Sequence, residues 1–495
     1  MASIIIRNCN QCELNIPLKI AQHIYNDLTV RHPNAFYLKQ RVKNWDGKIN
    51  FVKANGTFKI GLLPRIYNLC KIYGCNPTIV DKRRLIQDGK VVKKVGNYKL
   101  RPEQIKAISS VINNKVNGVP YHIGVIDYTV NAGKSLIMSG LYLSYKRRLK
   151  TLLITNDSDW LQQAKTEFKQ YLPDENITFI QGSKVFNWSN FSIGMVQSLS
   201  RNIRVYQEEL AKVDMVLVDE ADLAGSKMYQ TVITHLYNTR IRIGLSGTIY
   251  MSKLAKDRLN NLNLESFFGQ KIAEYKLSQS IKEGHSSNVV VKMIPQIQFW
   301  YTPQIKSTEY KDIYDEVITN NKLAFEVVSQ RLKFNIKYGR LPALVVCKYI
   351  NHCENIYSYL RQYDQSIFGK LRIERVHVNT RTKERNKIIQ DFREGKVDIL
   401  VSTTIVARGK NFPLLKCLIN AASMDSQEKT IQFLGRLVRT HKSKNKVYLD
   451  DIWYPGDYLD RHGKHRKRYY QSEGLKVIDM GRIWKKYDQN TPLPF

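Results

Sequence analysis

Three segments of this sequence carry residue types that could bind and hydrolyse a nucleotide. The first, YTVNAGKS at 128–135, follows an apolar run and ends in Asn131, Ala132, Gly133, Lys134 and Ser135. We expect a strand-to-helix turn here, whose backbone N–H groups point at phosphate oxygens. Lys134 would reach the β- and γ-phosphates of ATP, and the Ser135 hydroxyl would bind Mg²⁺. Tyr128 and Asn131 stand where the full phosphate-loop pattern has, or often has, glycine.

The second segment is VDMVLVDEAD at 213–222, an apolar run that ends in carboxylates. A buried strand delivers such acids to its carboxyl end, where ligands bind in open α/β sheets. We predict that Asp219 holds Mg²⁺ and that Glu220 orients or deprotonates the attacking water. The alternative is an acidic surface turn without catalytic function.

The third segment is IQFLGRLVRT at 431–440. Gln432, Arg436 and Arg439 are spaced by four and three residues, so they would project from one face of a helical turn. Arginines in this arrangement could neutralise the charge that grows on the γ-phosphate during hydrolysis. A basic helix face without catalytic function would look similar.

Strand-length apolar runs separated by longer amphipathic stretches indicate the elements that would position these residues. Such runs are typical of parallel strands buried on both faces by helices. They occur in two groups, one on each side of a polar and helical interval at roughly 265–335. The runs are HIGVIDY, TLLITN, FSIGMV, VDMVLVDE and IRIGLSG, then ALVVCK, RIERVHV, VDILVSTT and KCLINAA. The pattern predicts an α/β protein with two parallel-sheet domains in tandem.

The first 80 residues lack this alternation, and Asp46-Gly47 and Asn55-Gly56 suggest β-hairpins there. We predict a small α+β accessory domain that binds DNA, within 1–95 together with a basic linker. The two α/β domains would then span 96–290 and 291–495. The second domain includes a basic stretch, RHGKHRKRYY at 461–470, which could hold a duplex arm or simply form a solvated helix face.

The composition points to a polyanionic partner. The chain has 78 Lys and Arg against 43 Asp and Glu, a formal net charge of +35 over 495 residues. Nucleic acid is the expected partner, and anionic lipid the alternative. Because no run of 18 apolar residues and no signal peptide is present, we expect a cytoplasmic protein without a membrane segment. Seven scattered cysteines suggest reduced thiols, although Cys9 and Cys12 with Cys70 and Cys75 could in principle bind zinc.

Taken in order, these motifs resemble a superfamily 2 helicase or translocase across residues 98–450. The resemblance implies two RecA-like domains and an adenine-sensing role for Gln104 in LRPEQ. It also implies that Ser246 and Thr248 in LSGT couple hydrolysis to domain movement. It assigns strand contacts to the remaining motif residues, which are Thr155, Gln197, Lys348, Thr403 and Arg408.

The last motif reads QFLGR, unlike the HRIGR of DEAD-box RNA helicases, and this favours a DNA motor. NWDGKINF at 44–51, followed by GLLPRIYNLCKIYG, resembles the accessory domain of the UvsW family of phage recombination helicases. That resemblance implies an ATP-dependent helicase that unwinds, anneals or migrates branched DNA in recombination, replication and repair. It would then be a phage protein that acts in the host cytoplasm. An RNA helicase, or a degenerate ATPase fold that only binds DNA, are the alternatives.

Overall fold

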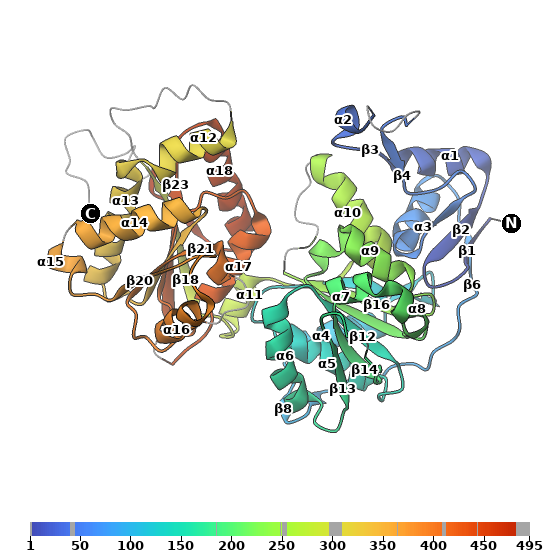
Figure 1. Cartoon of the computed structure of the whole chain (residues 1–495). Helices are drawn as coiled ribbons and strands as arrows, with labels where there is room; N and C mark the ends of the chain where they lie inside the picture. The colour runs from blue at the N-terminus through green and yellow to red at the C-terminus, as the bar shows by residue number, and fades with distance from the viewer. Residues whose placement is uncertain are drawn as a thin grey trace. The chain divides into compact units, whose positions relative to one another are not determined.

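The computed structural model describes residues 2–39, 45–184, 186–247, 249, 255–296, 309–363, 365–407, 412–442 and 444–481. The chain divides into two compact units (Figure 1). Unit 1 comprises residues 1–128 and 132–275, and unit 2 comprises residues 129–131 and 276–495. In the part of the chain that is described, no helix is both long and apolar enough to cross a bilayer.

Unit 1 begins with a mixed four-stranded sheet in the order β5-β2-β1-β6, in which only β1 and β6 are parallel. A two-stranded hairpin, β3 with β4, extends from it. The elements of this N-terminal subdomain are β1 (Ser3–Ile6), β2 (Gln11–Asn15), α1 (Leu18–Asp27), β3 (Thr29–Arg31), α2 (Ala35–Lys39), β4 (Lys48–Asn50), β5 (Thr57–Lys59), η1 (Ile60–Leu62), α3 (Leu63–Ile72) and β6 (Thr78–Asp81). The subdomain is α+β, as predicted. Gly47 and Gly56 both have positive φ, as expected for the predicted turns.

The N-terminal subdomain is anchored to the larger part of unit 1 by polar contacts and a shared core. Arg65 makes a two-pronged ion pair with the buried carboxylate of Glu265, at 2.8 and 2.7 Å. The buried Arg242 donates to the backbone carbonyl of Cys9 at 2.9 Å, and the Tyr121 hydroxyl donates to that of Ile60 at 3.0 Å. Because Arg242, Tyr121 and Glu265 are buried and bonded across the two parts, these contacts fix the subdomain within unit 1.

The main sheet of unit 1 has seven parallel strands in the order β13-β14-β12-β15-β16-β11-β17. Its strands are β11 (Ile123–Tyr128), β12 (Thr151–Thr155), β13 (Ile177–Ile180), β14 (Phe191–Met195), β15 (Met215–Asp219), β16 (Ile241–Ser246) and β17 (Lys271–Tyr275). Its helices are α4 (Pro102–Ile112), α5 (Lys134–Ser144), α6 (Ser158–Tyr171), α7 (Val196–Arg201), α8 (Ile203–Ala211), η2 (Ala221–Gly225), α9 (Lys227–Thr234) and α10 (Ala255–Phe268). Two short hairpins precede the sheet, β7 (Lys94–Val95) with β8 (Tyr98–Lys99) and β9 (Lys115–Val116) with β10 (Val119–Pro120).

Unit 2 has a second seven-stranded parallel sheet, in the order β20-β21-β19-β22-β23-β18-β24. Numbered from the first strand of each sheet, both orders read 3-4-2-5-6-1-7, so the two sheets have the same topology. The strands are β18 (Asn288–Pro295), β19 (Ala343–Cys347), β20 (Ile373–Val376), β21 (Ile399–Thr403), β22 (Cys417–Asn420), β23 (Lys446–Trp453) and β24 (Val477–Asp479). The helices are α11 (Leu277–Lys282), α12 (Tyr310–Tyr314), η3 (Asp315–Thr319), α13 (Lys322–Lys337), α14 (Ile350–Gln362), α15 (Gln365–Phe368), α16 (Thr382–Arg393), η4 (Thr404–Ala407), α17 (Gln427–Leu437) and α18 (Asp457–Ser472).

Both faces of each sheet are buried, which explains why the strands read as continuous apolar runs. In unit 1, Leu153 belongs to one apolar core, whereas its neighbours Leu152 and Ile154 belong to another. In unit 2, Leu344 and Val345 divide in the same way. The predicted fold class, two parallel-sheet domains with a small N-terminal mixed sheet, is therefore confirmed.

The nine apolar runs named in the sequence all contain strands. The interval at 265–335, predicted to be polar and helical, also contains two strands. It contains β17, the edge strand of the first sheet, and β18, an inner strand of the second. β17 alternates between exposed and buried positions, as an edge strand does, so it lacks a continuous apolar signal. The polar residues just before β18 lower the apolar content of this part of the interval.

Candidate nucleotide site

The phosphate loop leaves β11 at Tyr128 and enters α5 at Lys134. Asn131 and Gly133 both have positive φ, of 66° and 74°. Asparagine is among the few residues with a side chain that tolerate this conformation, which explains why it can stand at a position where glycine is common. The N–H groups of the first turn of α5, which includes Lys134 and Ser135, have no acceptor within the helix, so the loop can receive phosphate oxygens.

Gly133 must remain glycine because a Cβ at this position would lie 2.4 Å from the side-chain nitrogen of Gln104. That nitrogen donates to the backbone carbonyl of the buried Ala132 at 2.9 Å, while the Gln104 oxygen accepts from the backbone N–H of Arg101 at 3.0 Å. Gln104, predicted to sense adenine, is therefore buried and bonded to the phosphate loop in this structure. It links the start of α4 to the loop.

Tyr128 makes a second link between α4 and the loop. Its side chain is 1% exposed, its ring packs against Tyr275 with centroids 5.4 Å apart, and its hydroxyl donates to the carbonyl of Glu103 at 2.7 Å. The ammonium of Lys134 donates to the Tyr128 carbonyl at 3.4 Å. The residue that departs most from the phosphate-loop pattern is thus the one that fixes where the loop begins. Sequence reasoning noted the departure but did not find this role.

The acidic pair lies at the carboxyl end of β15. Asp219 is 5% exposed, and its Oδ1 atom has no hydrogen-bond partner among the described residues. Burial raises the pKa of this carboxyl group well above its usual range, the negative charge of Glu220 raises it further, and Lys134 opposes both effects. Such an oxygen is expected where a cation binds, because a buried unpaired carboxylate is otherwise costly.

Glu220 follows in the left-handed region, with φ of 50° and ψ of 54°. This conformation is uncommon for a residue with a side chain and costs of order 1–3 kcal/mol, a strain that is typical of functional positions. Close packing of Gly244 accommodates the turn, since a Cβ there would lie 2.7 Å from the Cβ of Ala221. Nothing in the sequence pattern reveals this backbone strain.

The next strand brings a hydroxyl to the acids. Ser246, at the end of β16, donates to Asp222 at 2.7 Å and lies 3.4 Å from a carboxylate oxygen of Glu220. The acidic turn is therefore hydrogen-bonded to the end of β16, and the coupling role of Ser246 stays a prediction. Thr248, the other predicted coupling residue, lies outside the described residues. The partner of Ser246, Asp222, was missed at the sequence level although it is the last letter of DEAD.

The chemistry of the donors in unit 1 suits a magnesium ion. Mg²⁺ prefers oxygen ligands and is commonly held by one or two carboxylates together with phosphate oxygens. The unpaired oxygen of Asp219 and the hydroxyl of Ser135, on the second residue of α5, are donors of this type.

Three residues of α17 and its end form one partly exposed face in unit 2. In the segment 431–439 the only residues that are not fully buried are Gln432, Arg436 and Arg439. The helix ends at Leu437, so Arg439 lies just beyond it, but the backbone N–H of Val438 still donates to the Leu434 carbonyl at 3.0 Å and continues the helical hydrogen-bond pattern. The prediction of a shared face therefore agrees with the backbone.

The residues predicted to contact a nucleic-acid strand differ in accessibility. Thr155 is 1% exposed and its hydroxyl accepts from the backbone N–H of Asp157 at 3.2 Å. Gln197 is partly exposed and donates to the carbonyl of Asn156 at 3.3 Å. Thr403 is largely buried at the end of β21. Arg408 lies outside the described residues.

Lys348 follows β19, and its ammonium lies over three tyrosine rings. The nearest, Tyr310, is 4.0 Å from it, and Tyr349 and Tyr314 are 5.0 and 5.3 Å away. Burial, together with the positive charge of Lys429, lowers the pKa of Lys348 to about 8. The rings stabilise the charged form, so Lys348 is a positioned cation rather than a free surface lysine.

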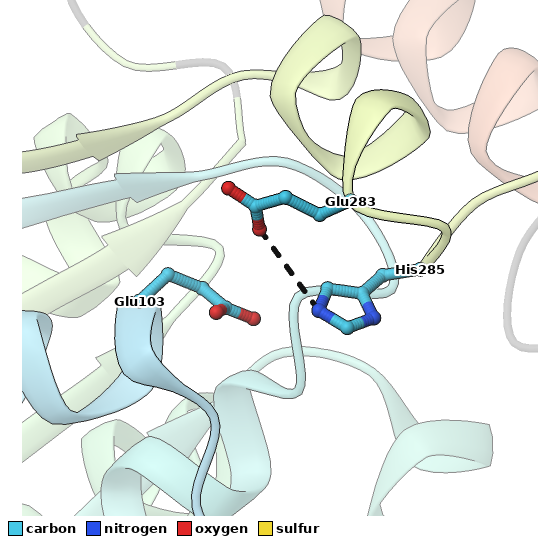
Figure 2. A group of neighbouring side chains, drawn as sticks. All are labelled: Glu103, Glu283 and His285. Atoms are coloured by element: carbon cyan, nitrogen blue, oxygen red, sulfur yellow. Dashed lines mark ion pairs between the residues drawn. The ribbon is translucent and has the colours of Figure 1, made fainter.

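The zinc alternative receives no support. All four cysteines concerned are buried, and burial raises the pKa of the Cys9 and Cys12 thiols. None of them belongs to a group of three or more metal-binding side chains in the part of the chain that the structure describes. Figure 2 draws Glu283 and His285, which follow α11 in unit 2, with their side chains 3.9 Å apart. Both are partly exposed, and such surface pairs contribute little.

Comparison with known proteins agrees with this architecture. The family described as type III restriction enzyme, res subunit, matches residues 97–251, and the helicase conserved C-terminal domain matches residues 326–441. The ATP-dependent DNA helicase uvsW of Enterobacteria phage T4 is 22% identical over 91% of this chain and 89% of its own. The ATP-dependent RNA helicase DBP6 of Lodderomyces elongisporus is 33% identical, but over only 24% of this chain and 21% of its own.

Among solved structures, the type ISP restriction-modification enzyme LlaBIII bound to DNA superposes with a TM-score of 0.56 at 14% identity. The match covers 80% of this chain and 32% of the enzyme, and it supports the fold alone. The two family matches fall on the two parallel-sheet units, the first over the phosphate loop and acids and the second over all of α17 and the two arginines. The chain therefore belongs to the superfamily 2 helicases and is an ATP hydrolase.

Proposed function

We propose that this chain is an ATP-dependent DNA helicase or translocase whose hydrolytic residues lie at the carboxyl edge of the unit 1 sheet. The observation that carries the site assignment is the buried Asp219 oxygen without a partner, beside a strained Glu220 and under the charge of Lys134. In this scheme the loop from Asn131 to Ser135 binds the phosphates, with Lys134 on the β- and γ-phosphates. Glu220 takes the proton of the attacking water or orients it.

Magnesium, when bound by Asp219 and Ser135, neutralises charge on the phosphate oxygens. Lys134 would leave the Tyr128 carbonyl for the phosphates, and the hydrogen bond that it gives up is long, at 3.4 Å. Gln104 and Tyr128 hold the loop in place, so that binding requires little rearrangement of the backbone. Ser246 is hydrogen-bonded to Asp222, so in this proposal a change in the acidic turn on hydrolysis would move the end of β16.

Unit 2 supplies the arginines in this proposal. Arg436 and Arg439 share one partly exposed face with Gln432, and the residues between them are buried. They would stabilise the charge that develops on the γ-phosphate, as arginine fingers do. ATP binding and hydrolysis would thereby alternately strengthen and weaken the binding of each unit to a nucleic-acid strand. The segments that would contact the strand contain Thr155, Gln197, Lys348, Thr403 and Arg408.

DNA is the proposed substrate for two reasons. The net charge of +35 calls for a polyanion, and a relative that matches 91% of the chain is a DNA helicase by name. The RNA helicase DBP6 matches only a quarter of the chain. We propose branched DNA, at forks and Holliday junctions in recombination, replication and repair, and action in the host cytoplasm of a phage. RNA is the alternative substrate.

The basic helix α18 has two faces with different roles. His462, Arg466 and Tyr470 are buried and belong to the core of unit 2. A second set of basic residues is exposed and spaced three and four residues apart, so that it shares one side of the helix; its members are Arg461, Lys464 and Arg468. We propose that this exposed side contacts the phosphates of a duplex arm.

The substrate assignment is tested by ATP hydrolysis and strand separation on a panel of forked DNA, Holliday junctions, tailed duplexes, single-stranded DNA and RNA. We expect DNA to stimulate phosphate release and branched DNA to be unwound or migrated. Greater stimulation by RNA than by any DNA would replace the proposal with the RNA alternative. Since most contacts would go to the backbone, the affinity should fall steeply with salt and depend little on base sequence.

A further inference from the structure

The connection between β3 and β4 presents two aromatic side chains to solvent. Phe36 and Tyr37, on the short helix α2, are 72% and 70% exposed, and their rings meet edge to face with centroids 5.4 Å apart. Figure 1 shows α2 at the end of the β3–β4 hairpin. Single exposed apolar residues are common, but two adjacent large aromatics in contact form a patch that suggests a binding role.

The residues below this pair hold α2 in place. The backbone N–H of His32 donates to the Gly47 carbonyl at 2.8 Å, and that of the buried Ala35 donates to the His32 carbonyl at 3.0 Å. The Trp45 indole donates to the Lys48 carbonyl at 2.9 Å and packs edge-on against the His32 ring. The aromatic pair is therefore presented by a bonded turn. Lys48 is exposed beside Trp45, whereas Arg41 and Lys43 lie outside the described residues.

The hairpin is also tied to the larger part of unit 1. Arg258, on α10, donates to the carbonyl of Asp27 at 2.7 Å, two residues before β3 begins. Together with the buried contacts of Arg65, Arg242 and Tyr121, this bond fixes the hairpin relative to the phosphate loop and the acids of the same unit. A ligand held by the aromatic pair would accordingly keep a fixed position relative to the nucleotide site.

Positive charge surrounds the pair. Arg31 and Lys48 are exposed and directly opposite each other in the β3–β4 ladder. Lys39 is exposed one turn after Phe36, and its side chain runs over Gly47, where a Cβ would lie 2.8 Å from its Cε atom. In the described part of the connection, the one acid is Asp46, whose carboxylate accepts the backbone N–H of Lys48 at 2.9 Å. We name Arg31, Phe36, Tyr37, Lys39 and Lys48 the aromatic tip.

We propose that the aromatic tip binds unpaired DNA bases, with Phe36 and Tyr37 stacking on the bases and the three basic residues contacting the adjacent phosphates. Aromatic side chains flanked by cations bind single strands in this way without strong sequence preference, because every base has a π-face. An apolar protein surface would not need three cations around two rings. The inference rests on the proposed function, since it identifies the form of DNA that one surface of the motor recognises.

The test measures the affinity of the full chain for a fluorescent single-stranded oligonucleotide by anisotropy, without ATP. Replacing both rings, in Phe36→Ala with Tyr37→Ala, should weaken binding roughly tenfold to a hundredfold. The pair Phe36→Trp with Tyr37→Trp should restore it, whereas Phe36→Leu with Tyr37→Leu should not. An abasic oligonucleotide of the same length should bind the wild type as weakly as the normal oligonucleotide binds the alanine variant.

Leu18→Ala and Ile72→Ala are matched controls, because these side chains are 88% and 73% exposed in the same subdomain but carry no aromatic ring. They should leave the affinity unchanged. Equal affinity of the alanine variant and the wild type, or equal binding of abasic and normal strands, would overturn the inference. So would full rescue by leucine. If DNA stimulates ATP hydrolysis by the wild type while the alanine variant binds the oligonucleotide with unchanged affinity, only the inference about the aromatic tip is wrong. If DNA does not stimulate ATP hydrolysis by the wild type at all, the proposed function itself is rejected.

Discussion

The two parallel sheets have the same strand order, but their buried aspartates differ in how completely they are hydrogen-bonded. In unit 1, Asp219 ends β15 with an oxygen that has no partner among the described residues. In unit 2, Asp451 lies in β23, and its carboxylate is fully used: Arg466 binds it at 2.8 Å, the Tyr470 hydroxyl at 2.6 Å and the Asn420 amide at 2.9 Å. Both Asp451 and Arg466 have side chains that are 0% exposed.

The difference follows from what covers the edge of each sheet. In unit 2, α18 packs against the residues after β22, where Arg466 donates to the carbonyl of Met424 at 3.2 Å and His462 contacts that of Ser423 at 3.1 Å. In unit 1, the equivalent strand β15 leads directly into Glu220 and its strained turn. The same topology can therefore serve two purposes. Buried polar groups without internal partners are available to bind a ligand, whereas buried polar groups that are hydrogen-bonded internally stabilise the fold.

The largest expected effect tests the unit 1 side of this comparison. Glu220→Gln keeps the size of the side chain but removes the base, so kcat for ATP hydrolysis should fall by roughly 10²–10⁴. Nucleotide binding, followed with a fluorescent ATP analogue, should remain. Near-normal turnover in this variant would move the catalytic base to another residue.

The second prediction tests the unit 2 side. Asp451→Asn leaves the buried Arg466 guanidinium without its counter-charge, which should lower the free energy of unfolding by about 3–5 kcal/mol. Thermal or denaturant unfolding measures the loss. The control is Glu394→Gln, which removes an exposed pair with Lys396 and should leave stability unchanged. A stable Asp451→Asn protein that has lost ATP hydrolysis would show that Asp451 is not purely structural.

The third prediction concerns pH and again unit 2. His352 is fully buried, and burial lowers its pKa to about 3. Unfolding therefore takes up a proton below about pH 6.5, so stability is retained above that pH and falls as the pH decreases toward 3. At pH 5 the loss should be about 2 kcal/mol. His352→Gln, which can still form a hydrogen bond with the Tyr314 hydroxyl but does not titrate, should flatten the profile. An unchanged profile would contradict the assignment.

The smallest effect concerns the phosphate loop. Tyr128→Phe removes the hydroxyl that donates to the Glu103 carbonyl and should cost about 1–2 kcal/mol of stability. Because this bond fixes the start of the loop, KM for ATP should also rise a few fold. Tyr142→Phe is the matched control, since Tyr142 is equally buried in the same unit but donates to Glu175. An equal rise of KM in both variants would mean that the effect is not specific to the loop.

The inner strands and the order of the site motifs could be predicted from the sequence, because they depend on the composition along each strand and on the order of short motifs. Residues such as Leu152–Ile154 are apolar because both faces of the sheet are covered, so their runs identify inner strands directly. β17 was missed because one of its edges is free and its burial alternates. The acids of β15 were predicted because a strand must deliver them to its carboxyl end.

Features that depend on distant partners could not be predicted. The hydroxyl of Tyr128 finds its acceptor 25 residues away, and the sequence contains no pattern that pairs the two. The left-handed conformation of Glu220 depends on packing around Gly244 rather than on its own type. Likewise, the buried Arg466 and the exposed Arg461 and Arg468 are the same residue type on one helix, and the position of Asp451 explains why Arg466 is buried.

The central claim is that ATP hydrolysis belongs to the carboxyl edge of the unit 1 sheet. Lys134→Ala tests it most directly, because Lys134 is not fully buried and makes only a long hydrogen bond in this structure, so the variant should fold normally. With DNA present, phosphate release should fall by about a hundredfold or more while the unfolding transition stays unchanged. A folded Lys134→Ala protein that retains substantial DNA-stimulated hydrolysis would contradict the claim.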